Sequence, residues 1–255
     1  MRVTVCELRD EPTAFAEDWR HLVGHVAEEQ SDLVILPEMG FASWFAASPS
    51  FDAATWQAAV VAHDRWLARL GELAPAVVVA SRPVDTPAGR RNEGFVWSPA
   101  EGYRPVRQKY YLPDEEGYWE ARWYDRGDGD FPPAQAGRAS LGLLICTELW
   151  FQERARAYGR GGAHLIAVPR ATGKPTLEKW LVGGRAASVA AGAYVGSSNK
   201  RSDDPAVDLG GQGWLVGPDG EVLAITTPAT PVVTVVIDLA HAMAAKATYP
   251  RYVRE

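Results

Sequence analysis

The chain has 255 residues, of which 47% are hydrophobic and 23% are charged, and its formal net charge is −6. This composition excludes a disordered or fibrous chain, and the longest apolar stretches are too short to span a bilayer. The negative charge, without any run of Lys and Arg, argues against a nucleic-acid surface, because phosphate binding rests on clustered positive charge. We therefore expect one domain over residues 1–255 that acts on a small molecule.

The N-terminus and the cysteines indicate a cytoplasmic protein. The first residues, MRVTVCEL, enter an alternating β-branched pattern and lack the parts of a secretory signal. Cys6 and Cys146 lie 140 positions apart, which is not a disulfide framework, so each is expected as a free thiol. The ten tryptophans favour a lined pocket or a subunit interface beside the core, and we expect a homo-oligomer, a dimer or larger.

The first third of the chain alternates between strands and helices. Residues 2–8 are expected as a strand, and Pro12 opens an amphipathic helix. DLVILPE then predicts a short strand that is buried on both faces. Asp52 can cap a second helix, and AVVVAS at 76–81 is the next buried strand. This order predicts right-handed crossovers and a largely parallel sheet.

The rest of the chain adds antiparallel elements. NEGFVWS and YRPVRQ flank PAEG and predict a hairpin, after which residues 109–130 form a long irregular stretch of the kind that tends to be functional. A strand ending at Cys146, a helix over about 150–158, the strand HLIAVP and a helix over about 177–192 follow. The closing segments predict further antiparallel strands around a Pro-Asp-Gly turn. A mixed sheet covered by helices is the expected fold.

Reactive side chains stand where apolar strands end, which is where ligands bind in open α/β sheets. Glu38 follows four apolar residues and a proline, so burial would raise its pKa and suit it to accept a proton, although a lone acid after a strand is commonly just solvated. Cys146 alone favours a buried structural thiol, but the helical pattern of TELWFQERARAY would favour a thiolate. Lys109 is either an ordinary surface residue or a fixed charge for an oxyanion.

The remaining motifs do not indicate a metal or cofactor site. His21 and His25 lie four apart on a helix, but HLVGH lacks the glutamate of a zinc-protease helix, and no cluster of His, Cys and carboxylates has metal-binding spacing. The glycines of GRGGAH and LGGQG do not lie between a strand and a helix and indicate turns. We therefore expect no metal and no cofactor.

Three segments occur in a characteristic order. LVILPE, RQKYYLPDEEGYWE and LLICTELWF place Lys109 71 residues after Glu38 and Cys146 37 residues after Lys109. Together they resemble the nitrilase superfamily, the carbon-nitrogen hydrolases, and the similarity continues through GAHLIAVPRATG, GRAASVAAGAYVGSSN and GWLVGPDGEVLA. The resemblance covers nearly the whole chain. It implies a four-layer αββα sandwich with mixed sheets and a catalytic triad of Glu38, Lys109 and Cys146.

The resemblance also implies a further glutamate in the loop after the lysine. Members that resemble the ureidopropionase branch place it eleven residues after the lysine, at Glu120 here, and others place it about seven after, at Glu116. The aromatic residues of YWE favour Glu120 as the catalytic residue, which leaves Glu116 as a substrate-binding candidate.

The implied chemistry is cysteine-dependent C–N hydrolysis. Glu38 takes the thiol proton, Cys146 attacks the carbonyl carbon, and Lys109 with the N–H of Thr147 stabilises the oxyanion, before water hydrolyses the thioester. Nitrile-cleaving members resemble CWE after the nucleophile, whereas Thr147 and Glu148 follow it here. This favours a small linear amide, with an N-carbamoyl compound as the alternative. A non-catalytic member that binds a metabolite or a protein is the hypothesis from another class.

Candidates for substrate binding follow from side-chain chemistry. Arg170 is a candidate for a substrate carboxylate and Glu148 for a substrate amine, unless the two pair with each other. Tyr111, Trp119 and Trp150 are candidates for the pocket wall, with core positions as the alternative. The expected partner is a small amide or carbamoyl compound, with no nucleic acid and no membrane.

Overall fold

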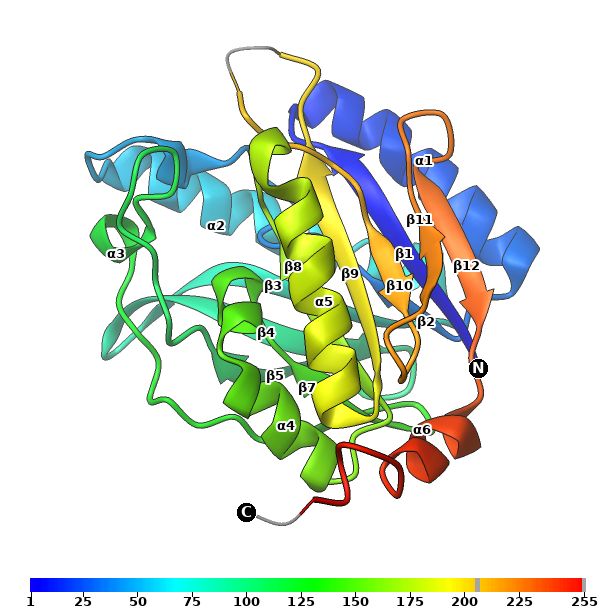
Figure 1. The fold of residues 1–255 in the computed structure, drawn as a ribbon. Coiled ribbons are helices and arrows are strands. Elements are labelled where there is room, and N and C mark those ends of the chain that lie inside the picture. The colour runs from blue at the N-terminus through cyan, green and yellow to red at the C-terminus, as the bar shows by residue number, and fades with distance from the viewer. Residues whose placement is uncertain (205–206, 254–255) are drawn as a thin grey trace.

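The computed structural model describes residues 1–204 and 207–253 (Figure 1). Within these residues the strands join into one mixed sheet of twelve strands, which folds back so that its two halves pack face to face. The first half, from its edge inward, consists of β5 (Gly102–Gln108), β4 (Gly89–Ser98), β3 (Val77–Thr86), β2 (Leu33–Ile35) and β1 (Arg2–Arg9). The second half continues with β9 (Tyr194–Arg201), β8 (Leu165–Arg170), β7 (Ala139–Leu143) and β6 (Ala134–Ala136).

The closing strands pair antiparallel, as the sequence predicts. β10 (Trp214–Val216) pairs with β9, β11 (Val222–Ile225) pairs with β10, and β12 (Val232–Val236) pairs with β1. β4 also pairs antiparallel with β3 on one side and with β5 on the other. The pair β4 and β5 is the predicted hairpin. In contrast, β7, β8, β9, β1, β2 and β3 run parallel to one another. Their carboxyl ends therefore meet at one edge of the molecule.

Helices cover the outer side of each half of the sheet (Figure 1). On the side of β1 and β3 lie α1 (Pro12–Glu29) and α2 (Ala53–Leu67), and on the side of β7 and β9 lie α4 (Gln152–Arg160) and α5 (Leu177–Ala191). The short helices α3 (Glu120–Trp123) and α6 (Leu239–Ala245) complete the set. The expected four-layer αββα arrangement with mixed strands is confirmed.

Burial explains the local structure. Successive side chains of a strand point to opposite faces, so Leu33 and Ile35 of β2 pack between the two halves while Val34 packs beneath the helices. A strand in this place needs apolar residues throughout, as the LVIL run has. At the start of α2, Asp52 accepts the N–H of Thr55 at 2.7 Å, which is the predicted cap.

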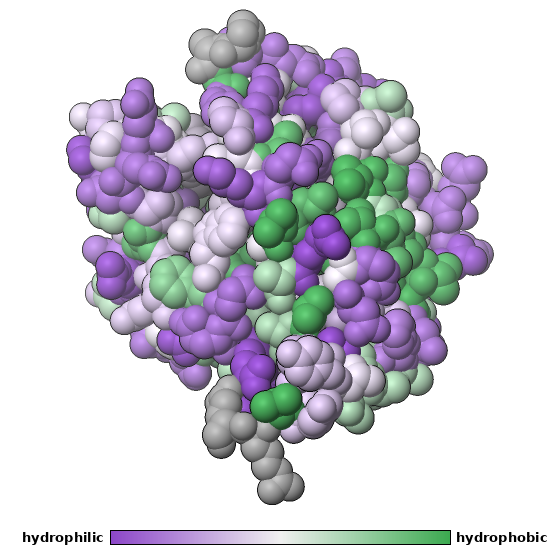
Figure 2. Space-filling view, in the orientation of Figure 1, coloured by the Kyte–Doolittle hydropathy of each residue, from purple (hydrophilic) through white to green (hydrophobic). Residues whose placement is uncertain are grey.

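Part of the surface is apolar. Hydrophobic side chains gather over β11 and β12 (Figure 2), where the exposed members are Val222, Leu223, Ile225 and Val236. Among the described residues, no helix combines the length and apolar character that a membrane crossing requires. The homo-oligomer stays a prediction.

Candidate active site

The parallel strands bring distant residues to one edge. Glu38 lies three residues beyond β2, and its N–H donates to the carbonyl of Arg170, the last residue of β8, at 3.1 Å. Cys146 lies three residues beyond β7. Lys109 directly follows β5, and its N–H donates to the carbonyl of Asn92 on β4 at 2.8 Å. These side chains therefore lie within three residues of strand ends, and the hydrogen bonds of the sheet limit how far the segments that carry them can move.

Lys109 is the centre of a buried ionic cluster. Its Nζ donates to Glu38 Oε1 at 2.8 Å and to Glu120 Oε2 at 2.5 Å, and all three residues have no solvent exposure. Asn92 Nδ2 donates to the same Glu38 oxygen at 2.8 Å, and the hydroxyl of Tyr124 donates to Glu120 Oε2. The remaining oxygens, Glu38 Oε2 and Glu120 Oε1, have no hydrogen-bond partner within the described chain. Each carboxylate thus keeps one oxygen open.

The members of the cluster alter one another's pKa values. Burial alone would lower the pKa of Lys109, but the carboxylates of Glu120 and Glu38 outweigh it and raise that pKa, so the ammonium is permanent. Burial raises the pKa of Glu120 to about 7, with the charge of Lys109 acting in the opposite direction. Glu120 is therefore the titrating group of the cluster near neutral pH. Glu116 is exposed instead, on the loop before α3, and does not enter the cluster.

Cys146 sits on a strained turn. Its φ is +50°, a left-handed conformation that non-glycine residues rarely adopt, and such strain clusters at active sites. The residue opens a short 3₁₀-helix, η3 (Cys146–Trp150), and α4 begins only at Gln152. The expected α-helix N-terminus at the thiol is therefore absent. Burial and then the charge of Glu38 raise the pKa of Cys146 well above its ordinary value, against the effect of Lys109, so the free thiol stays protonated.

A second buried ion pair fixes the backbone on either side of the cluster. Arg107 holds both oxygens of Glu148, with Nη2 2.8 Å from Oε1 and Nη1 bonded to Oε2. The same carboxylate accepts the N–H of Tyr110 and the N–H of Ile145, each at 2.8 Å. These two residues adjoin Lys109 and Cys146 in the chain. Glu148 therefore connects the segment that carries Lys109 to the turn that carries Cys146. Because both of its oxygens are used in this way, its carboxylate is not open to a substrate amine.

Arg170 is also turned inward. Its guanidinium donates to the hydroxyls of Ser197 at 2.6 Å and Thr172 at 3.0 Å and to the carbonyl of Gln212 at 2.7 Å, and the residue has no exposure. Burial lowers the pKa of Arg170 to about 9. Arg170 and Glu148 do not pair with each other. The guanidinium is enclosed by its hydrogen-bond partners, Thr172 among them, and is not open to a substrate carboxylate.

A cavity of about 280 Å³ opens onto the thiol. It is lined by Pro113, Glu115, Tyr118, Cys146, Thr147, Trp150, Ala171, Thr172, Gly173, Thr176, Lys179 and Trp180. The predictions for Thr147 and Trp150 agree with this lining. Tyr111 instead stacks on Phe151, with ring centroids 3.4 Å apart, and Trp119 lies under the guanidinium of Arg122 at 3.9 Å. These two rings are packing residues outside the cavity wall.

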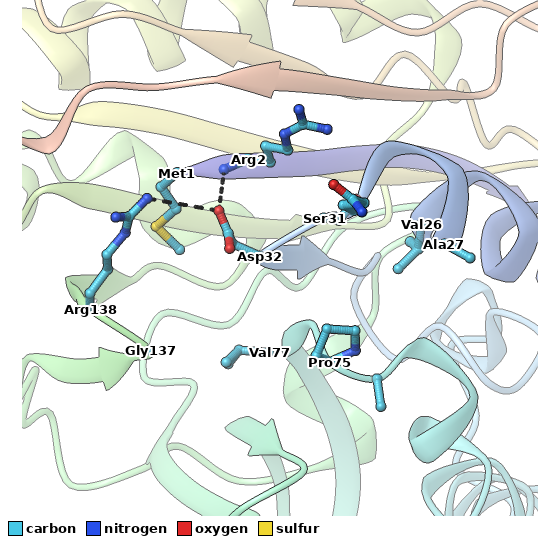
Figure 3. A pocket seen from close by; sticks show the side chains of 12 residues that line it. Met1, Arg2, Val26, Ala27, Ser31, Asp32, Pro75, Val77, Gly137 and Arg138 are labelled. Carbon is cyan, nitrogen blue, oxygen red and sulfur yellow. Dashed lines mark hydrogen bonds and ion pairs between the residues drawn. The ribbon is translucent and has the colours of Figure 1, made fainter.

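A larger cavity lies at the other end of the sheet. It measures about 840 Å³ and opens where β1, β2 and β3 begin, among Met1, Asp32 and Val77 (Figure 3). Asp32 accepts the N–H of Arg2 at 2.7 Å and lies 4.0 Å from the guanidinium of Arg138. No Cys, Glu or Lys lines it. The smaller cavity, which Cys146 lines, is therefore the candidate active site. Within the described ranges, no group of His, Cys and carboxylates could hold a metal ion.

The family model described as carbon-nitrogen hydrolase matches residues 2–247. The chain belongs to this family. It is an enzyme family, and the protein is accordingly a carbon-nitrogen hydrolase. The resemblance expected from the three sequence segments is confirmed.

Relatives and solved structures agree with this assignment. The hydrolase is 26% identical over 134 residues to N-carbamoylputrescine amidase of Arabidopsis thaliana, a match that covers 47% of this chain and 45% of that protein, about half its length. The crystal structure of a carbon-nitrogen hydrolase from Helicobacter pylori G27 superimposes with a TM-score of 0.86 at 22% identity, covering 98% and 94% of the two chains. An amidase from Nesterenkonia sp. gives a TM-score of 0.78 at 20% identity, covering 95% and 92%.

Apart from Lys109, the side chains that hold the buried carboxylates of the hydrolase's site were not predicted. Asn92 and Tyr124 hold the two carboxylates, and Arg107 holds Glu148. Asn92 had a signal, because a short polar residue stands within the strand pattern NEGFVWS, where an inward-facing polar group needs a partner. Arg107, on β5, precedes Lys109 by two residues, and a spacing of two in extended chain places side chains on the same face.

Proposed function

We propose that this carbon-nitrogen hydrolase is an amidase that cleaves a small linear amide through a thioester on Cys146. The observation that carries the proposal is the state of Glu38. One oxygen is held by Lys109 and Asn92, while Oε2 is open, and the carboxylate is close enough to Cys146 to act on the pKa of its thiol. A fixed carboxylate with one open oxygen beside a protonated thiol is the arrangement that general-base activation needs.

The first half-reaction releases ammonia. Glu38 Oε2 takes the thiol proton as Sγ attacks the carbonyl carbon, and the carbonyl oxygen gains the negative charge. The permanent ammonium of Lys109 and the N–H of Thr147, a residue of the cavity wall, stabilise that oxyanion. Glu38 then gives the proton to the amide nitrogen, the C–N bond breaks, and the acyl group stays on Sγ as a thioester.

The second half-reaction restores the enzyme. Glu38, again a carboxylate, takes a proton from water, whose oxygen attacks the thioester carbon. The C–S bond breaks, the proton returns to Sγ, and the carboxylic acid leaves. Because Glu120 has a pKa of about 7 through burial and shares Lys109 with Glu38, its protonation sets how strongly the ammonium is drawn towards Glu38. Every step uses residues of this chain and water.

The N-carbamoyl reaction is the second candidate, supported by the similarity to N-carbamoylputrescine amidase. The same residues would attack the ureido carbon, and the products would include carbon dioxide as well as ammonia. Product analysis separates the two reactions.

A panel of short amides and N-carbamoyl compounds tests the proposal. We expect ammonia from at least one short amide without carbon dioxide, and no ammonia above background from the variant Cys146→Ala. The variant Cys6→Ala is the matched control, because Cys6 is the other buried free thiol. Ammonia release that persists in Cys146→Ala would reject the mechanism, and carbon dioxide in equal amount would select the N-carbamoyl reaction.

A further inference from the structure

The cavity in front of Cys146 is lined mainly by aromatic, small and hydroxyl-bearing residues, with two charged side chains among them. The rings of Tyr118, Trp150 and Trp180 form much of its wall, and Glu115 and Lys179 are the charged residues that line it. Its volume of about 280 Å³ is at the small end of the range for ligand sites, ~300 to 1,000 Å³. The acyl part of the substrate is therefore short.

The two charges come from different walls and are not paired. Glu115 lies in the loop between β5 and α3, and Lys179 lies in the first turn of α5. Both side chains are exposed, and neither forms an ion pair with any residue in the described ranges 1–204 and 207–253. Glu115 and Lys179 thus line one small cavity and form no ion pair with another side chain. Both are available to a ligand that carries a positive and a negative charge.

Rigid backbone presents each charge. The turn after Glu115 is closed by the N–H of Tyr118, which donates to the Glu115 carbonyl at 2.9 Å, and Gly117 takes the left-handed φ of +81° that the turn requires. Trp44 Nε1 donates to the Gly117 carbonyl at 3.0 Å and anchors the turn. Such fixed placement reduces the entropy that a ligand must remove from the site on binding.

On the other wall, the helix α5 carries Lys179 next to Trp180. The Trp180 ring packs against Trp150 with centroids 5.1 Å apart, so the lysine is held beside the aromatic wall. The nucleophile lies inside the same cavity and is only 2% exposed. A bound amide therefore reaches Cys146 with its amide carbon while its far end meets the two exposed charges.

We propose that the substrate is a small amino-acid amide whose ammonium and carboxylate lie at the end remote from the amide, with Lys179 contacting the carboxylate and Glu115 contacting the ammonium. This inference rests on the proposed amidase function and specifies its substrate class. A neutral amide fills the same space but gains nothing from either charge. An amide with one charge gains from one side chain and is repelled by the other.

Four amides of matched chain length test the inference. Glutamine carries both charges, glutaric acid monoamide only the carboxylate, 4-aminobutanamide only the ammonium, and butanamide neither. We expect kcat/KM for ammonia release to be highest for glutamine, by about tenfold over butanamide, with the two singly charged amides below glutamine.

Two variants are measured with each of the four amides. Lys179→Met should lower kcat/KM about fivefold for the two carboxylate-bearing amides, leave butanamide unchanged and raise kcat/KM for 4-aminobutanamide, whose ammonium is no longer repelled. Glu115→Gln should lower kcat/KM about fivefold for the two ammonium-bearing amides, leave butanamide unchanged and raise kcat/KM for glutaric acid monoamide, whose carboxylate is no longer repelled. Lys174→Met and Glu116→Gln are matched controls, because these exposed charges stand on the same two segments outside the cavity wall.

The outcomes separate the two proposals. Butanamide turnover equal to that of glutamine, or variants that change all four substrates alike, would overturn the substrate class and leave the amidase function in place. Ammonia from none of the four, alongside carbon dioxide and ammonia from N-carbamoyl compounds, would overturn both. Circular dichroism of each variant confirms that it is folded.

Discussion

Two buried ionic groups are centred on Arg107 and Lys109 at the end of β5, and they differ in how many of their carboxylate oxygens have hydrogen-bond partners. Around Arg107, both oxygens of Glu148 are used by the guanidinium and by two backbone N–H groups. Around Lys109, Glu38 and Glu120 each leave one oxygen without a partner. A fully satisfied buried pair holds structure together, whereas an open carboxylate in the same kind of surroundings is available for proton transfer. The same substitution, Glu to Gln, should therefore have different effects in the two groups.

The largest effect is expected at the open group. Glu38→Gln keeps the shape of the side chain but removes the base, so kcat/KM for amide hydrolysis should fall about 10³-fold. The free energy of unfolding should change little, because Lys109 keeps Glu120 as its counter-ion. Steady-state ammonia release and urea unfolding measure the two quantities. Activity that stays within a few fold of the parent would rule out Glu38 as the base.

The satisfied group should respond in stability. Glu148→Gln leaves Arg107 without a counter-ion in a site that has essentially no exposure, and breaking a buried pair of this kind costs about 4 kcal/mol of unfolding free energy. The loss of activity should be smaller than for Glu38→Gln and should appear in kcat rather than KM, because only the Lys109 and Cys146 segments shift. Urea unfolding checks it, and a variant as stable as the parent would contradict the structural role of the pair.

Much of the site follows from local sequence, and the rest depends on distant contacts. Glu38 and Cys146 could be placed because apolar strands end beside them. The partners of Glu148 could not be placed, because Arg107 on β5 and the Tyr110 N–H just beyond that strand lie about 40 residues earlier in the chain. Local helical pattern also overestimated the order after Cys146, where Glu148 captures the Ile145 N–H and a 3₁₀ turn precedes α4.

The aromatic wall shows the same limit. Side-chain chemistry makes Tyr111 and Trp119 candidates for the pocket wall, but Tyr118 is the ring from that loop that lines the cavity. Which residue of an irregular segment faces inward is set by its turns, here by Gly117 and the Trp44 contact. Trp180 was out of reach of sequence reasoning because it enters from α5, which joins the site only through the sheet.

A smaller effect is expected from the pH dependence of Glu120. Its pKa is raised from 4.5 to about 7 in the folded protein, chiefly by burial. The native state therefore binds the proton more tightly than the unfolded chain. Its contribution to stability is complete below pH 4.5 and is lost as pH rises through 7. The parent should lose about 2 kcal/mol more than Glu120→Gln between pH 5 and pH 8. Urea unfolding at both pH values measures this, and equal losses in the two proteins would reject the raised pKa.

The most direct test of the account is capture of the acyl group on Cys146. With the most active amide of the panel, hydroxylamine should divert the acyl group to a hydroxamate, and mass spectrometry of the acid-quenched and digested protein should find the acyl mass on the peptide that contains Cys146. Both signals should vanish in Cys146→Ala and persist in Cys6→Ala. Ammonia release without any hydroxamate or adduct, at a rate that Cys146→Ala leaves unchanged, would contradict the claim that Cys146 is the nucleophile.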